Sequence, residues 1–286
     1  MKVQQHNVSV GDISLFVEER GEGYPVIVLH GGPGLDHHQF GDYLDPLTDE
    51  YRLVLVDQRG QGLSEQVPPE TCSLENCARD VVLLAAALGL DRYAVLGHSW
   101  GAFVALQNAV DHPGKAAQSI ISAGVPSARY LEKVFANLEN FEPVELRQQV
   151  IDSWAQEKDL QTEEQAAASM HDQWPFQFKD PFDPRIPEFE ARTQGVRYSP
   201  EITRYFAADE GYGGIEVEDR LRDVSQPVLV IGGRHERTCV VEGSEAIAAG
   251  IPGAELVILE NSAHMTYVEE NDAYLRAVRR FLSAHR

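Results

Sequence analysis

Short apolar strands alternate with amphipathic helices at both ends of this 286-residue chain, and this alternation limits its fold more than any other feature. Residues 25–29, 53–56 and 93–96 are almost wholly apolar, which is typical of strands buried on both faces of a sheet. Ser73 is a suitable N-cap for a helix whose apolar residues recur at helical spacing until Gly89. Strands joined by helices form parallel βαβ units, so the sequence predicts an α/β fold.

The alternation is interrupted once, in the middle of the chain. Residues 125–226 have helical periodicity and little strand signal, and Thr162 with Gln165 has the spacing of a capping box. Apolar strands and helices resume at Pro227. We therefore expect an α/β core formed by residues 1–124 and 227–286, and a mainly helical insertion between them.

Composition argues against several classes of partner. The chain has 45 acidic and 24 basic residues, a net charge of −21, which repels phosphate backbones and anionic headgroups. We therefore expect neither nucleic acid nor a membrane surface as a partner. Cys72, Cys77 and Cys239 form no CxxC pair, and the start of the sequence lacks the apolar run of a signal peptide. These features predict a cytoplasmic protein with reduced thiols.

The segment Gly97-His98-Ser99-Trp100-Gly101 lies between a predicted strand and a predicted helix. This is the context in which a G-x-S-x-G motif forms a nucleophile elbow. The turn is so tight that side chains two residues before and after the serine would collide with the strand and the helix. The turn would raise the hydroxyl above the sheet edge, near the positive end of the following helix. We therefore predict that Ser99 is a nucleophile.

A serine hydroxyl needs a general base, and in folds with this elbow the acid and then the histidine follow the serine along the chain. His264 follows the predicted strand 256–259 through a short turn, at the carboxyl edge where α/β sites form, so it is the predicted base. The loop after the predicted strand 228–231 contains one carboxylate, Glu236. We predict that Glu236 orients His264 and stabilises its imidazolium form.

A glycine-rich loop, residues 30–34, directly follows the first buried strand. Glycines allow backbone N–H groups to turn inward, so the N–H groups of Gly32 and Trp100 are the predicted oxyanion hole. The loop lacks G-x-G-x-x-G and a Walker lysine, which makes a phosphate cradle the weaker interpretation.

Other conspicuous side chains have modest interpretations. His37 and His38 lack HExxH or matching carboxylate spacing, so we expect a solvated helix start there and no metal. The aromatic residues of the insertion either line a substrate pocket or form the insertion's own core. These residues are Trp154, Trp174, Phe176 and Phe178.

With these motifs, the chain resembles α/β-hydrolase-fold serine hydrolases of the proline iminopeptidase type. The motifs that carry the resemblance over most of the chain are His30-Gly31-Gly32-Pro33-Gly34, Asp57-Gln58-Arg59-Gly60 with Gly62, the elbow, the acid loop and Ser262-Ala263-His264. The resemblance implies a mostly parallel eight-stranded sheet, a helical cap over the site and no cofactor. It also implies hydrolysis of a small-molecule or short-peptide substrate through an acyl-enzyme, often with release of an N-terminal residue.

Two positions depart from the family pattern. The acid is usually aspartate, and the extra methylene of Glu236 moves its carboxylate by about 1.5 Å, so either the loop retreats or activity is low. In the peptidases, glutamates hold the substrate's ammonium, and one of them follows the catalytic acid directly. Arg237 stands at that position here, and Glu210 is the matching cap glutamate. With Gly31 and Trp174, these two residues are the predicted substrate contacts.

Three functional alternatives therefore remain from the sequence. An aminopeptidase and an esterase or lactonase of the same fold are nearly balanced, because Arg237 is unfavourable for an ammonium pocket. A noncatalytic ligand-binding module is the third, although all the parts of a catalytic site are present. Epoxide hydrolase and dehalogenase chemistry would need a carboxylate in place of Ser99.

Overall fold

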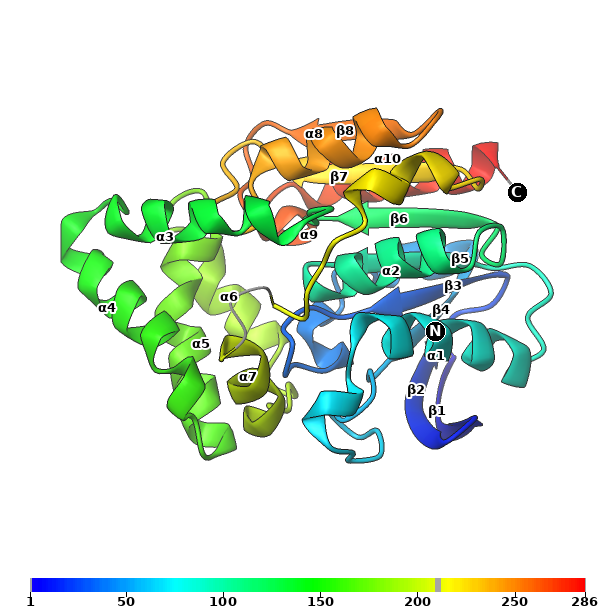
Figure 1. Cartoon of the computed structure of the whole chain (residues 1–286), viewed down its shortest axis with the longest axis horizontal. Helices are drawn as coiled ribbons and strands as arrows, with labels where there is room; N and C mark the ends of the chain where they lie inside the picture. Colours follow the sequence, from blue (N-terminus) through cyan, green and yellow to red (C-terminus); the bar gives the residue numbers. More distant parts are fainter. Residues whose placement is uncertain (1, 209–211, 286) are drawn as a thin grey trace.

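Eight strands form a single sheet in the computed structural model, which describes residues 2–208 and 212–285 (Figure 1). Its order is β1-β2-β4-β3-β5-β6-β7-β8. The strands are β1 (Val3–Val10), β2 (Ile13–Arg20), β3 (Tyr24–Leu29), β4 (Tyr51–Val56), β5 (Ala94–His98), β6 (Gln118–Ser122), β7 (Val228–Gly233) and β8 (Glu255–Leu259). The first two pairs, β1 with β2 and β2 with β4, are antiparallel, and all the other pairs are parallel. This confirms the predicted eight-stranded, mostly parallel sheet.

The central strands are apolar throughout because helices cover both faces of the sheet. Alternate residues of one strand point to opposite faces, so Ile27 packs in one core and Val28 in the other. The helices of the first face are α1 (Leu74–Ala87), α2 (Trp100–Asp111) and α8 (Val241–Gly250). The helices of the second face are α9 (Thr266–Glu269) and α10 (Asn271–Ala284). None of the helices in the described ranges is long and apolar enough to cross a membrane.

Between β6 and β7 the described residues form five α-helices that stand beside the sheet, at the left of Figure 1. They are α3 (Glu132–Glu139), α4 (Val144–Ala155), α5 (Glu163–Gln177), α6 (Arg185–Arg192) and α7 (Pro200–Ala207). The capping box predicted at Thr162 and Gln165 is present at the start of α5. Val150 and Phe176 belong to a small apolar core formed within this group. The insertion therefore folds around its own side chains as well as against the sheet.

Candidate active site

The turn between β5 and α2 has the strained geometry that its sequence predicts. Ser99 has φ +56°, a left-handed conformation that is rare for a residue with a side chain. A Cβ atom at Gly97 would lie 1.9 Å from the carbonyl oxygen of Gly101. One at Gly101 would lie 2.2 Å from the carbonyl oxygen of Leu29. Glycine is therefore required on both sides of the serine for the strand and the helix to pack this closely.

The loops after β7 and β8 bring His264 and Glu236 into contact. The Nδ1 atom of His264 lies 2.8 Å from Oε2 of Glu236. A carboxylate only accepts hydrogen bonds, so Nδ1 carries the proton and Nε2 is the unprotonated nitrogen of the neutral ring. The longer side chain of glutamate thus reaches the imidazole at ordinary hydrogen-bond distance.

Glu236 is held as a carboxylate although it is buried, with only 1% of its side chain exposed. Burial acts to raise its pKa, but the neighbouring His264 and the N–H groups of Thr238 and Cys239 outweigh this and hold the pKa below its usual value. The N–H of Thr238 donates to Oε1 at 3.0 Å. An acid loop with two backbone donors therefore stabilises the ionised form that a histidine needs as its partner.

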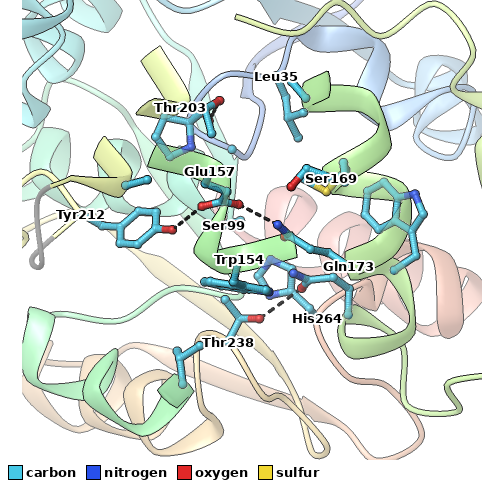
Figure 2. Close-up of a pocket in the computed structure, with 18 of the residues that line it drawn as sticks. Leu35, Ser99, Trp154, Glu157, Ser169, Gln173, Thr203, Tyr212, Thr238 and His264 are labelled. Atoms are coloured by element: carbon cyan, nitrogen blue, oxygen red, sulfur yellow. Dashed lines mark hydrogen bonds between the residues drawn. The ribbon is translucent and has the colours of Figure 1, made fainter. Parts of the chain in front are cut away.

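Ser99 and His264 line one cavity of about 410 Å³, together with Gly32 (Figure 2). The neighbouring Gly31 is engaged, because its N–H donates to Oε1 of Gln39 at 2.6 Å. The N–H of Trp100 is at the first position of α2, where a helix offers no internal acceptor. Gly32 and Trp100 therefore stay the predicted pair of oxyanion donors.

A second motif, residues 57–60, contacts the glycine-rich loop. The side-chain amide of Gln58 donates to the carbonyl of His30 at 2.8 Å, and the N–H of Gln58 donates to Nε2 of His30 at 3.1 Å. Arg59 bonds both carboxylate oxygens of Asp80 in the core, at 2.7 and 2.9 Å. Gln58 thus holds the backbone of His30, at the start of the glycine-rich loop.

The wall of the cavity contributed by the insertion is mainly apolar but contains a buried carboxylate, Glu157. It accepts hydrogen bonds from Nε2 of Gln173 at 2.7 Å and from the hydroxyl of Tyr212 at 3.0 Å (Figure 2). Both partners are neutral, and burial raises the pKa of Glu157 above its usual value. The apolar part of the wall includes Leu138, Ile151, Trp154 and Met170. The described lining of this side thus has Glu157 as its one acidic group, with Lys158 as a basic group, in a mainly apolar surface.

The predicted substrate contacts have different positions in the structure. Trp174 lines the cavity and also packs edge-on against Phe189, so it serves the pocket and the core together. Gly31 packs near the Cβ of Ser99. Arg237 is absent from the described residues that line the cavity, and its guanidinium donates to backbone carbonyls of the insertion, which differs from the predicted substrate contact. Glu210 lies outside the described residues.

The histidine pair after the glycine-rich loop is not simply a solvated helix start. Asp36, His37 and His38 each offer a metal-binding atom within 4.8 Å of the others. However, Nδ1 of His38 is 2.9 Å from Asp36, and Nδ1 of the fully buried His37 is 2.6 Å from Asp57. Burial alone would lower the pKa of His37, but hydrogen bonds to Asp57 and Glu18 raise it to about 9. The prediction of a solvated helix start is wrong for His37, because its ring is buried and hydrogen-bonded to carboxylates within the protein.

Sequence reasoning missed Glu157, Gln173 and Tyr212. The one available signal is that Glu157 continues the helical spacing of the buried Val150 and Ser153, although α4 ends at Ala155 and Glu157 lies in the 3-10 turn that follows. A carboxylate on such a face is unusual and indicates a buried charge with a function. The partners of Glu157 are 16 and 55 residues away, so no local pattern connects them.

The alpha/beta hydrolase fold family matches residues 24–271, and the chain belongs to this family. The protein is therefore a hydrolase of the α/β class. It is 27% identical over 284 residues to a proline iminopeptidase of Lactobacillus acidophilus, covering 94% of this chain and 93% of the relative. It is 28% identical over 290 residues to a proline iminopeptidase of Clostridioides difficile, with the same coverage of each chain.

Solved structures share the fold over nearly the whole chain. An alpha/beta fold family hydrolase from Bacillus anthracis superimposes with a TM-score of 0.81 at 21% identity, covering 98% of this chain and 99% of the other. Proline iminopeptidase from Mycobacterium smegmatis superimposes with 0.77 at 24% identity, covering 99% and 98%. An N-acyl homoserine lactone degrading enzyme gives 0.70 at 22% identity, covering 96% and 100%. At these identities the likeness concerns the fold.

Proposed function

We propose that this protein is a serine hydrolase that releases an N-terminal residue from short peptides or small amides through an acyl-enzyme. The observation that carries the proposal is the 2.8 Å contact between Nδ1 of His264 and Glu236, in a site where His264 shares a cavity with the elbow serine Ser99. Residues 1–124 and 227–286 serve as the core, and residues 125–226 as a cap over the cavity. Buried free cysteines and the acidic charge support a cytoplasmic enzyme that does not act on nucleic acid.

The reaction follows from the protonation state of the imidazole. Nε2 of His264 takes the proton from the Ser99 hydroxyl as the oxygen attacks the substrate carbonyl carbon. The N–H groups of Gly32 and Trp100 stabilise the resulting oxyanion, at about 3 kcal/mol each. The imidazolium, stabilised by Glu236, then gives its proton to the leaving nitrogen or oxygen. Water repeats the sequence on the acyl-enzyme and restores the serine hydroxyl.

The acidic group in the cap supports a substrate with a free amine. Glu157 is buried and lines the same cavity as Ser99, and within residues 2–208 and 212–285 its hydrogen-bond partners are the neutral Gln173 and Tyr212, although Lys158 also lines the cavity. A buried carboxylate without a cation is costly, and a substrate ammonium would supply the missing charge. Glu157, rather than the predicted Glu210 or Arg237, is therefore our proposed contact for the N-terminal ammonium.

An esterase or lactonase is the second candidate. Two observations favour it: the cavity wall is largely apolar, and Arg237 replaces the glutamate that follows the acid in the peptidases. Such an enzyme would use the same serine, histidine and oxyanion donors. It would have no use for Glu157 as an ammonium ligand.

A matched substrate panel separates these candidates. Proline 4-nitroanilide, its N-acetyl derivative, 4-nitrophenyl acetate and simple lactones would be compared at one pH. We expect turnover of the free amine and little of the acetylated amide, because acetylation removes the positive charge. Activity on esters and lactones without activity on any free-amine amide would replace the aminopeptidase with the second candidate. Intact mass after a fluorophosphonate should show one adduct, absent in Ser99→Ala.

A further inference from the structure

One buried carboxylate outside the cavity joins the cap to the loop that carries His264. Oε1 of Glu269, at the end of α9, accepts the N–H of Lys179 at 2.8 Å. Oε2 accepts the N–H of Ala263, also at 2.8 Å. Ala263 immediately precedes His264, and Lys179 lies two residues beyond the end of α5. The two oxygens of a single side chain therefore hold backbone from both parts of the proposed site.

The cap segment that Glu269 holds, residues 176–179, also contacts both catalytic loops directly. The carbonyl of Gln177 accepts the N–H of His264 at 3.0 Å. The side-chain oxygen of Gln177 accepts the hydroxyl of Thr238 at 3.1 Å, in the loop of Glu236. We call residues 176–179 the cap-exit segment. Its position is thus linked to the proposed base and to the proposed acid.

Arg237 holds the same segment from the other side. Its guanidinium donates to the carbonyls of Phe176 at 3.1 Å, Phe178 at 2.6 Å and Lys179 at 3.0 Å. Two charged side chains therefore hold the cap-exit segment. The cation Arg237 binds its carbonyls, and the anion Glu269 binds one of its N–H groups. This arrangement fixes the segment through charge-assisted bonds, which are stronger than bonds between neutral groups.

We propose that ionised Glu269 is a positioning residue, which holds the backbone of His264 against the cap-exit segment so that the imidazole can serve Ser99. The proposal rests on the proposed function in assigning that task to His264. Glu269 touches neither the serine nor the cavity, since it is absent from the described residues that line the cavity. Its contribution therefore acts through the loop of His264.

Protonation of Glu269 would break this bridge. A protonated carboxyl carries an O–H on one oxygen, and this oxygen accepts more weakly, so one of the two buried N–H groups loses its charged acceptor. Burial raises the pKa of Glu269 to about 7, although the N–H groups of Lys179 and Ala263 and the charge of Arg185 act to lower it. Loss of the bridge should therefore fall in the neutral range.

The charged groups around Glu269 come from three other segments. Arg185 donates to the backbone carbonyl of Glu269 and is paired with Asp183, whose charge raises the pKa of Glu269. Arg237 approaches from the acid loop and interacts favourably with Glu269. The ammonium of Lys179 is directed elsewhere, to Oδ1 of Asn261 at 3.1 Å. None of these neighbours titrates near pH 7 in water, so a neutral-range transition within this group belongs to Glu269.

The test is the pH profile of Glu269→Gln with 4-nitrophenyl acetate, an uncharged substrate. The amide retains one acceptor, but its NH₂ group opposes the other N–H at every pH. We expect kcat at pH 8 to fall about tenfold, the effect of losing one charge-assisted bond, with KM changed less than twofold. The wild type should show an extra tenfold step near pH 7 that the variant lacks. Glu260→Gln, an exposed carboxylate on the same loop, is the control.

The proposal would be overturned if Glu269→Gln had the wild-type kcat at pH 8 and if its kcat fell at acid pH as that of the wild type does. If Glu269→Gln does not fold, hydrogen exchange in the wild type provides the answer. Protection of the Lys179 and Ala263 amides, corrected for intrinsic rates, should fall by about tenfold between pH 8 and pH 6, and constant protection would contradict the bridge. Absence of fluorophosphonate labelling in the wild type would refute the proposed function instead, since the exchange experiment does not depend on catalysis.

Discussion

Two regions of the cavity differ in how they stabilise a buried glutamate. One is the floor, formed by the loops at the ends of the strands, which contains Glu236. The other is the wall formed by the cap, which contains Glu157. Glu236 has His264 and two backbone N–H groups as partners, and its pKa is held below the usual value. The hydrogen-bond partners of Glu157 in the described part of the chain are neutral, and burial raises its pKa. The floor pairs its acid with a histidine, whereas the described residues of the cap give Glu157 no cation as a hydrogen-bond partner. A carboxylate of the second kind is suited to binding a charged ligand.

The difference also concerns how each region is built. The floor consists of loops at the ends of β3, β5, β7 and β8, where strand and helix geometry fixes the backbone. The cap-side group joins Glu157 to Gln173 and Tyr212, which lie on separate segments. Changes in the floor should therefore abolish the reaction, and changes in the cap should alter the choice of substrate.

The largest effect is expected at the centre of the floor. Ser99→Ala should lower kcat by about 10⁶-fold on every substrate, the loss typical of a removed nucleophile. The variant should retain the wild-type circular dichroism spectrum, since the hydroxyl is not needed for the turn. Intact ligand-dependent function together with unchanged substrate binding would favour a noncatalytic binding module.

Glu236→Gln should follow, with kcat lowered by about 10⁴-fold on amides and esters alike. The amide keeps a similar shape but carries no charge to stabilise the imidazolium of His264. Its NH₂ group also favours the tautomer of His264 in which Nδ1 is unprotonated. Glu236→Asp keeps the charge and is the matched variant, expected to retain more activity than Glu236→Gln. A loss of less than tenfold in Glu236→Gln, measured as steady-state kcat, would assign Glu236 a structural role only.

The sheet and the floor could be predicted because their information is local. Apolar strands buried on both faces specify the parallel sheet, and the elbow around Ser99 requires glycines within two residues. His264 and Glu236 follow from chain order and from the single carboxylate in its loop. In these places backbone geometry leaves few residue types that fit.

The cap-side group and His37 could not be predicted because tertiary packing creates them. Glu157 gains its partners only when segments 16 and 55 residues away are brought against it. His37 is buried because Asp57, on the loop after β4, reaches its ring. The same limitation affects Arg237, whose backbone partners lie about 60 residues away in the chain. Helix and strand propensities and the spacing of residue types contain no information about such contacts.

Glu157→Gln should sharpen the contrast by affecting one class of substrate. On proline 4-nitroanilide we expect kcat/KM to fall by about 30-fold, the equivalent of about 2 kcal/mol for a lost buried charge pair. On 4-nitrophenyl acetate the change should stay within twofold. Glu145→Gln, on the exposed face of α4, controls for removal of an acid from the cap, and Glu210→Gln tests the contact predicted from the sequence. Equal losses on both substrates would contradict an ammonium site at Glu157.

The smallest effect is one of stability, and its sign distinguishes Glu157 from Glu236. A carboxyl whose folded pKa is raised binds protons more tightly in the folded state, so its contribution to stability falls as pH rises above the unfolded value, about 4.3. Glu157→Gln removes this cost and should stabilise the free enzyme by about 1 kcal/mol at pH 8.

The gain from Glu157→Gln should shrink as the pH is lowered toward pH 5, because the raised pKa favours protonation of the wild-type carboxyl in the folded state over the unfolded state. Urea unfolding at the two pH values measures both differences. Glu236→Gln should behave oppositely, since the folded pKa of Glu236 is lowered and its ionised form contributes stability at pH 8 that is lost at low pH. If Glu157→Gln destabilised the free enzyme at pH 8, its carboxylate would already be satisfied within the protein, and the cap would not differ from the floor in the way its contacts indicate.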